Sequence, residues 1–362
     1  MRIVAKVGTS SLTDGAGVIQ RDVIAALCDQ MATLRLQGHE VILVSSAAIS
    51  AGVAALGLSA RPNDVLTLQA LAAAGQPRLM EEYNRALGRH GLVGAQVLLV
   101  PHDFADRHQY LHSRNTLARL LDLGCVPIVN ENDTVASDEI RFGDNDRIAA
   151  LVAHNVSAHL LVLLTDTPGL YTADPRSDPT AVLIAEVAAN DPLLSVSAGA
   201  EGTSRGSGGM ASKLQAARIA SWSGVRAVIA QALRPDVLVD AVAGVSVGTA
   251  FAPNDRRLSA RKLWIGFASH SQGSVTVDAG AYAALVDGGR SLLPAGVIGV
   301  AGDFLEGATI EVCNPDGVVF ARGMAVLSAD IVQQHAGRST RDLPARIAHE
   351  VIHRDDLVLL PH

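Results

Sequence analysis

The stretch that decides the fold runs from RIVAKVGTSS, residues 2–11, to VILVSS, residues 41–46. The first six residues form a short, largely apolar run that leads into small residues. This pattern is typical of a buried strand that enters a loop. Apolar residues then recur at helical spacing until Gly38, where the helix should end. A second apolar run, Val41–Val44, follows. The stretch therefore predicts a β-loop-α-β unit with parallel strands and a right-handed crossover.

Strand-like and helical patterns continue to alternate, so we expect an α/β fold with a doubly wound, mainly parallel sheet. The further strands are predicted at Ala95–Val100, Val126–Val129, Leu160–Leu164 and Val225–Ile229, with helices at Ser113–Leu123 and Asp146–Ala153. After about Pro253 short runs punctuated by glycine replace most helical patterns. We expect a first domain over residues 1–253, a linker over 254–272 and a small β-rich domain over 273–362.

Composition narrows the class of protein. A formal net charge of -7 disfavours a general nucleic-acid binder, which needs clustered lysine and arginine. The three cysteines, Cys28, Cys125 and Cys313, are far apart in apolar contexts and predict buried free thiols. Lys6 and Gly8 interrupt any secretory core, and no apolar run reaches the roughly 18 residues of a membrane span. We therefore predict a cytoplasmic protein without a membrane segment.

Polar clusters follow four of the predicted strands. They are Gly8-Thr9-Ser10, Ser45-Ser46, Asn130-Glu-Asn-Asp133 and Thr165-Asp166. Ligands of open α/β sheets bind beyond the carboxyl ends of the strands. The four clusters therefore predict one shared site.

Two motifs have the small residues and lysines that phosphate binding needs. Lys6 ends a strand and precedes Gly8-Thr9-Ser10, although a solvent-seeking lysine before an ordinary turn explains it equally well. Gly206–Lys213 opens a helical run, so its glycines can surround a polyphosphate; a flexible linker is the alternative. Its spacing matches neither a Walker A loop nor a dinucleotide fingerprint, which argues against P-loop and Rossmann enzymes.

Asp144-Asn145-Asp146 stands at the start of a predicted helix, where one such residue is explained by capping. Capping does not explain three. An aspartate here can hold two lysines in place, and an asparagine can bind a substrate carboxylate or amine.

His349-Glu-Val-Ile-His353 matches the zinc-protease pattern HExxH. Few residues follow it, Val351–Leu360 also reads as a terminal strand, and no third ligand is evident downstream. We interpret the segment as a structural part of the β-rich domain and assign no residue as a metal ligand.

Taken together, motifs spread over nearly the whole chain resemble the glutamate 5-kinases, which have the amino-acid kinase fold. They are Lys6-Val-Gly-Thr-Ser10, Val44-Ser-Ser-Ala-Ala-Ile49, Ala72-Ala-Ala-Gly-Gln76, Asn130-Glu-Asn-Asp133, Gly143-Asp-Asn-Asp146, Leu164-Thr-Asp166, Gly169-Leu-Tyr-Thr-Ala-Asp-Pro-Arg176 and Gly208-Gly-Met-Ala-Ser-Lys213. From about residue 273, Asp278, Gly280, Ser291-Leu-Leu-Pro294, Gly302 and His353-Arg-Asp-Asp356 resemble the PUA domain that many of these enzymes carry.

The resemblance implies ATP-dependent phosphorylation of the γ-carboxylate of L-glutamate to glutamyl 5-phosphate, on the route to proline. It implies that Lys6, Lys213 and Asp146 are catalytic, and that Ser46, Asp133 and Asn145 bind glutamate. The implied nucleotide-binding residues are Lys6, Gly8, Thr9, Thr165, Asp166, Ser207, Gly208, Gly209, Met210, Ala211, Ser212 and Lys213. ATP with Mg²⁺ would be the phosphoryl donor, and proline inhibition and a homo-oligomer are further expectations.

One departure from the family pattern is Ala47, where these enzymes usually have glycine; its Cβ is expected to tighten or shift the glutamate pocket. Two alternatives stay open. The acceptor can be acetylglutamate, aspartate, carbamate or a nucleotide on the same fold. An RNA-binding protein with a vestigial kinase part is disfavoured by the acidic balance.

Overall fold

The computed structural model describes residues 1–104, 106–135, 144–175, 177–189, 191–194, 208–255, 258–269, 271–339, 341, 344 and 349–360. The chain divides into two compact units. The first comprises Met1–Ala189 and Ala200–Arg257, and the second comprises Asn190–Gly199 and Leu258–His362.

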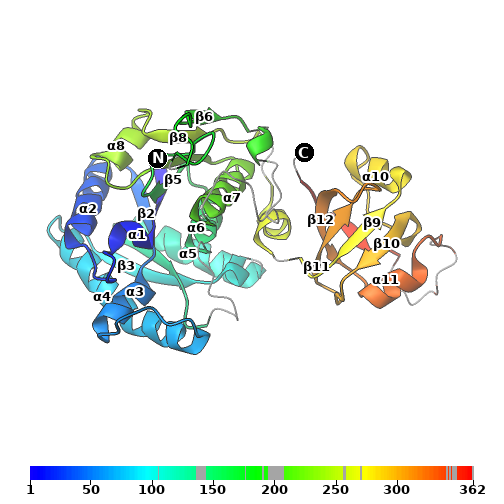
Figure 1. Cartoon of the computed structure of the whole chain (residues 1–362), viewed down its shortest axis with the longest axis horizontal. Coiled ribbons are helices and arrows are strands. Elements are labelled where there is room, and N and C mark those ends of the chain that lie inside the picture. The colour runs from blue at the N-terminus through cyan, green and yellow to red at the C-terminus, as the bar shows by residue number, and fades with distance from the viewer. Residues whose placement is uncertain are drawn as a thin grey trace. The chain divides into compact units, whose positions relative to one another are not determined.

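The first unit is built on an eight-stranded sheet (Figure 1). Its spatial order is β3 (Gly94–Leu99), β4 (Val126–Glu131), β2 (Glu40–Ser45), β1 (Arg2–Val7), β5 (Leu160–Thr165), β7 (Arg226–Gln231), β8 (Gly248–Phe251) and β6 (Glu186–Val187). All described pairings are parallel except β7 with β8. The α/β class and the mainly parallel sheet are therefore confirmed, and each predicted strand lies within two residues of its expected ends.

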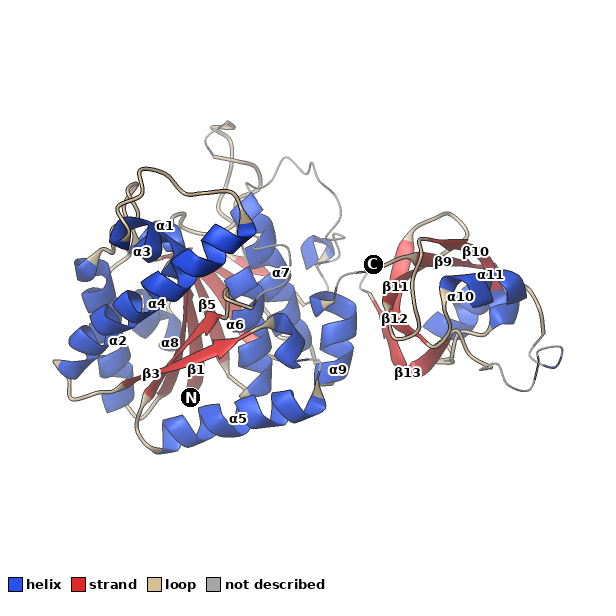
Figure 2. Cartoon of the chain, turned by 90° about the horizontal axis from the view of Figure 1, so that it is seen from below, coloured by secondary structure: helices blue, strands red, loops and turns tan. Residues whose placement is uncertain are grey.

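Helices cover both faces of this sheet (Figure 2). Helix α2 (Arg21–Leu36) contacts α4 (Val65–Gly88) and α8 (Val237–Val242), and α6 (Asp144–Asn155) contacts α7 (Gly208–Trp222). The remaining described helices of this unit are α1 (Thr9–Leu12), α3 (Ala48–Ala55), the 3-10 turn Pro101–Phe104 and α5 (Arg107–Asp122), and the 3-10 turn Pro192–Leu194 belongs to the second unit. The residues after β1 form the one-turn helix α1 where a loop was expected, because the amide of Thr13 donates to the carbonyl of Thr9.

Strand alternation decides which side chains of β1 meet which helices. Ile3, Ala5 and Val7 belong to the hydrophobic cluster that also contains residues of α2, α4 and α8. Successive side chains of a strand point to opposite faces, so Lys6 lies on the other face. Helix α6 contacts β1 there.

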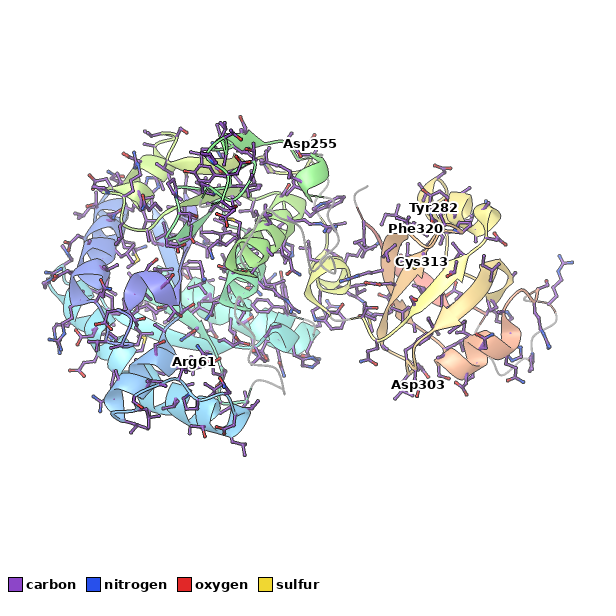
Figure 3. All side chains as sticks on the ribbon, viewed as in Figure 1. Arg61, Asp255, Tyr282, Asp303, Cys313 and Phe320 are labelled. Carbon is purple, nitrogen blue, oxygen red and sulfur yellow. The ribbon has the colours of Figure 1, made fainter. Side chains whose placement is uncertain are left out.

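The second unit contains a five-stranded sheet in the order β10 (Val297–Ala301), β9 (Ser274–Val277), β11 (Thr309–Cys313), β12 (Val319–Ala325) and β13 (Ile352–Leu359). Its helical elements are α9 (Ala260–Leu263), the π-helical turn Trp264–Ala268, α10 (Ala279–Val286), the 3-10 turn Pro294–Gly296 and α11 (Ala329–His335). Tyr282 of α10 stands edge-on to Phe320 of β12, with ring centroids 4.6 Å apart (Figure 3). The β-rich class is confirmed; α10 and α11 were not anticipated.

The C-terminal segment and the cysteines bear on smaller predictions. The segment that matches HExxH is extended at its end, since β13 begins at Ile352, and the expected terminal strand is present. In the described part of the chain, no three His, Cys, Asp or Glu side chains group as metal ligands. The three cysteines are free; Cys28 and Cys313 are buried and Cys125 is half-buried. None of the described helices has the length and apolarity that crossing a membrane requires.

Candidate active site

A buried triad of charges lies at the carboxyl end of the central strands. The ammonium of Lys6 is 2.7 Å from one carboxylate oxygen of Asp146, and that of Lys213 is 3.2 Å from the other. The three residues are 4%, 7% and 1% exposed for Lys6, Lys213 and Asp146. The hydroxyl of Ser212 donates to the same oxygen as Lys213, at 2.7 Å. One carboxylate thus fixes two lysines from distant parts of the chain.

Each member of the triad has a local reason for its place. Lys6 is the last but one residue of β1, on the face that α6 covers, and its Nζ would be 3.7 Å from a Cβ at Gly8, so the ammonium lies over that glycine. Asp146 occupies the first turn of α6. Lys213 and Ser212 lie in the first turns of α7, where the ammonium also donates to the carbonyl of Gly209.

Burial and charge act on these groups in opposite directions. Burial lowers the pKa of Lys6, and the nearby Lys213 lowers it further, while Asp146 opposes the shift. For Asp146, burial by itself would raise the pKa, but the charges of Lys6 and Lys213 hold the pKa below its usual value. The carboxylate is therefore ionised at neutral pH and serves as the counter-ion of both lysines.

A cavity of about 310 Å³ opens beside Lys213. It is lined by Ser10, Thr165, Asp166, Thr167, Gly169, Leu170, Tyr171, Ala173, Asp174, Pro175, Gly209, Met210 and Lys213. Five of these residues were predicted to bind nucleotide: Thr165, Asp166, Gly209, Met210 and Lys213. The hydroxyl of Thr165 donates to the carboxylate of Asp166 at 3.0 Å, which fixes both at the end of β5.

A second polar group begins one residue before Asp146. The amide nitrogen of Asn145 donates to the hydroxyl of Ser46 at 3.2 Å and to the amide oxygen of Asn130 at 2.9 Å. Asn130 donates in turn to Gln76 on α4, at 2.8 Å. Both amide hydrogens of Asn145 are thus engaged. Ser46 accepts one of them, and among the described residues its own O–H has no acceptor, so it can donate to a ligand.

The other predicted residues lie around these groups. Asp133 follows β4 by two residues and is half-buried, and its charge acts on the guanidinium of Arg61 in the α3–α4 loop. Gly8 and Thr9 join β1 to α1, and Gly208 and Ala211 belong to the first turn of α7. Ser207 lies outside the described residues.

Several residues of the site were not predicted from the sequence. Ser10 and Tyr171 line the cavity, and Asn130 and Gln76 hold Asn145. All four stood inside the motifs quoted above, so the signal was present, but a motif does not say which side chain turns toward a ligand.

The arrangement suits the transfer of an anionic group. The triad of two buried cations and one anion carries one excess positive charge beside a cavity that Asp166 and Asp174 also line, and a helix N-terminus at Gly208 adds positive potential. Asn145 and Asp146 are consecutive in one helical turn, so a polar ligand at Ser46 would lie next to the lysines. The site can therefore hold a polyphosphate and a small polar acceptor side by side.

Comparisons with known proteins identify the family of the chain. Residues 1–231 match the amino acid kinase family, and residues 273–347 match the PUA domain. The glutamate 5-kinase of Herpetosiphon aurantiacus is 48% identical over 362 residues, covering 99% of this chain and 98% of the relative. The glutamate 5-kinase of Trichlorobacter lovleyi is 46% identical over 365 residues, covering 100% of this chain and 97% of the relative.

Among solved structures, carbamate kinase from Giardia lamblia bound to AMP-PNP is 17% identical, with a TM-score of 0.51 over 70% of this chain and 98% of that chain. This likeness supports the fold alone. The match over the first 231 residues and the full-length identities establish the family. The chain belongs to the amino acid kinase family, as one of the glutamate 5-kinases that carry a C-terminal PUA domain.

Proposed function

We propose that this chain transfers the γ-phosphoryl group of ATP to the γ-carboxylate of L-glutamate, which gives glutamyl 5-phosphate in the first step of proline biosynthesis. The observation that carries the proposal is the Lys6–Asp146–Lys213 triad beside the Ser46–Asn145 pair. The full-length relatives named glutamate 5-kinase support the acceptor.

The chemistry explains the residue types. A glutamate carboxylate with an ordinary pKa of about 4.3 is already an anionic nucleophile at neutral pH, so no general base is needed. Its oxygen attacks the γ-phosphorus, the bond from that phosphorus to the β–γ bridging oxygen breaks, and ADP leaves with the electron pair. Lys6 and Lys213 would offset the repulsion between the two anions and the charge that develops on the transferred group.

The acceptor side would hold glutamate by complementary charge. Ser46 would donate its free hydroxyl hydrogen to a carboxylate, and Asp133 would face the ammonium group. Asn145 would orient Ser46 through the hydrogen bond that joins them. Because Asn145 adjoins Asp146, this places the γ-carboxylate next to the phosphoryl group.

On the donor side, Thr165, Asp166 and residues 207–213 would surround the nucleotide, with Gly8 and Thr9 facing its phosphates. Mg²⁺ fits this site as a companion of ATP, because it commonly keeps several waters and binds through substrate phosphates. Both oxygens of Asp146 are engaged by lysines, so Mg²⁺ would be held through the phosphates of ATP rather than by Asp146. When bound, Mg²⁺ would neutralise phosphate charge.

The remaining assignments follow from the family. We assign the kinase domain to residues 1–253, a linker to 254–272 and the PUA-like domain to 273–362, in accord with the two family matches. ATP and glutamate are cytoplasmic metabolites, so we expect the enzyme to act in the cytoplasm. Proline inhibition, a homo-oligomer and RNA binding by the PUA-like domain stay predictions.

The test is ADP release by the purified protein with ATP and Mg²⁺, with L-glutamate, acetylglutamate, aspartate and carbamate compared. Hydroxylamine is added to trap an acyl phosphate as the hydroxamate. We expect glutamate-dependent turnover and a hydroxamate. Turnover with another acceptor alone would overturn the substrate, and silence with all four would overturn the kinase assignment.

A further inference from the structure

The turn that carries Ser46 contains a strained residue. Ala47 has φ 85° and ψ 6°, in the left-handed region that favours glycine, and it is the N-cap of α3. A residue with a Cβ keeps this conformation only when its surroundings hold it there. Ala47 is buried within the hydrophobic cluster that includes Leu79 and Tyr83 of α4. Ala47 therefore belongs to the core, and the expected effect of its Cβ on the glutamate pocket stays a prediction.

Two hydroxyl groups hold this turn, that of Ser45 at the end of β2 and that of Tyr83 on α4. Ser45 donates to the carbonyl oxygen of Ser46 at 3.1 Å, and the hydroxyls of Ser45 and Tyr83 are 2.8 Å apart. A serine hydroxyl has one hydrogen, so when Ser45 gives it to Ser46, Tyr83 must be the donor in the second bond. Burial raises the pKa of Tyr83, which keeps the phenol protonated and able to donate.

The direction of this relay decides what it controls. It runs from the Tyr83 hydroxyl through Ser45 to the carbonyl of Ser46, and that carbonyl belongs to the peptide that joins Ser46 to Ala47. The orientation of a peptide plane sets the φ of the residue after it. Losing the relay would let Ala47 relax from its left-handed conformation and turn Ser46 with it.

Helix α4 therefore reaches the Ser46–Asn145 pair by two routes. Tyr83 acts on Ser46 through Ser45, and Gln76 acts on Asn145 through Asn130. Next to Gln76, Gly75 lets α4 touch the first residue of α3, because a Cβ there would lie 1.9 Å from the carbonyl oxygen of Ala48. The same helix thus sets the positions of both partners.

We propose that Tyr83 is a positioning residue for the acceptor substrate: its hydroxyl, acting through Ser45, holds the strained Ala47 turn and so aims the Ser46 hydroxyl at the glutamate carboxylate. This inference rests on the proposed function. It assigns Tyr83 no contact with substrate and no part in the phosphoryl transfer.

The test is a set of substitutions with the steady-state constants for both substrates. Tyr83→Phe keeps the ring and removes one hydrogen bond, so the KM for glutamate should rise roughly three- to tenfold. The kcat and the KM for ATP should change less than about twofold, because the triad is untouched. Tyr110→Phe, on α5, is the matched control and should leave all constants unchanged.

The strain itself is tested by repeating Tyr83→Phe in an Ala47→Gly background. Glycine adopts the left-handed turn without strain, so the rise in KM caused by Tyr83→Phe should fall to less than about twofold there. An equal rise in both backgrounds would overturn the proposal, as would a loss of kcat without a change in KM. Ser45→Ala breaks the relay at its second hydroxyl group and should raise the KM for glutamate as Tyr83→Phe does. It replaces Tyr83→Phe in the test if that variant folds poorly.

Wild-type turnover separates this inference from the proposed function. A wild-type enzyme that is active with glutamate, and whose KM is insensitive to both Tyr83→Phe and Ser45→Ala, removes only the positioning role. A wild-type enzyme that is silent with glutamate but active with another acceptor overturns both.

Discussion

Gly75 of α4 is the residue at which the smallest substitution should do the greatest damage. A Cβ at this position would lie 1.9 Å from the carbonyl oxygen of Ala48 and 2.4 Å from the amide nitrogen of Gly52. Ordinary contact begins at 3.4 Å, so α3 and α4 would have to move apart by 1.5 Å. Both obstructing atoms are backbone, and neither can turn aside.

The expected effect has two parts. Overpacking a close interface typically costs about 1–3 kcal/mol, and the rigid backbone on both sides places Gly75→Ala at the upper end, about 3 kcal/mol of unfolding free energy. The shift also displaces Ala48 relative to Gln76. Ala48 adjoins the Ser46 turn, and Gln76 supports Asn145 through Asn130. Misplacing reacting groups by about 1 Å can cost 100-fold, so kcat/KM for glutamate should fall by roughly that factor.

Gly88→Ala is the matched control on the same helix. It replaces the last residue of α4, where a Cβ would meet nothing within 4 Å, and alanine is favoured over glycine in helices by up to about 1 kcal/mol. Urea unfolding followed by Trp222 fluorescence, in a Trp264→Phe background, reports on the first unit alone. If the Gly75→Ala and Gly88→Ala variants unfold at the same urea concentration, the inference that α3 and α4 pack closely at Gly75 is refuted.

Three further outcomes test the site. Lys6→Ala and Lys213→Ala should each lower kcat about 100-fold with a smaller change in KM, because their charge matters most in the transition state; unchanged kcat in single-turnover measurements would remove these roles. Because burial lowers the pKa of Lys6, kcat/KM for ATP should fall at alkaline pH below the ordinary lysine range, as the amine loses its proton; a profile flat through that range would contradict this. Asp133→Asn should mainly raise the KM for glutamate, by roughly tenfold, and a purely kcat effect would exclude Asp133 from substrate binding.

The fold was largely predictable because its signals are local. The strands β1, β2, β4 and β5 are short apolar runs that end in small or polar residues, and each was placed within two residues of its observed ends. Helix α10 was missed for a related reason: Ala279–Val286 is apolar almost throughout, so no helical period stands out. Helix α4 has Pro77 in its interior, which sequence rules treat as a helix end.

The support of the site was not predictable, because it depends on contacts between residues far apart in the chain. Asn130 and Gln76 are separated by 54 residues, and Ser45 and Tyr83 by 38. Nothing in the local sequence around any of the four distinguishes a cap, a turn and a buried network. The packing of α4 brings these residues together, and no periodicity in the sequence predicts how α4 crosses α3.

The charge balance of the triad connects the fold to the chemistry. Lys6 and Lys213 share one carboxylate, so the buried group carries one excess positive charge, and burial of such a charge is costly. A second carboxylate would remove the cost, but it would also repel the two anions that must meet here. The lowered pKa of Lys6 reflects this cost, because both burial and the charge of Lys213 disfavour the protonated ammonium. A bound polyphosphate supplies the missing counter-charge, so the arrangement is more favourable with substrate than without it.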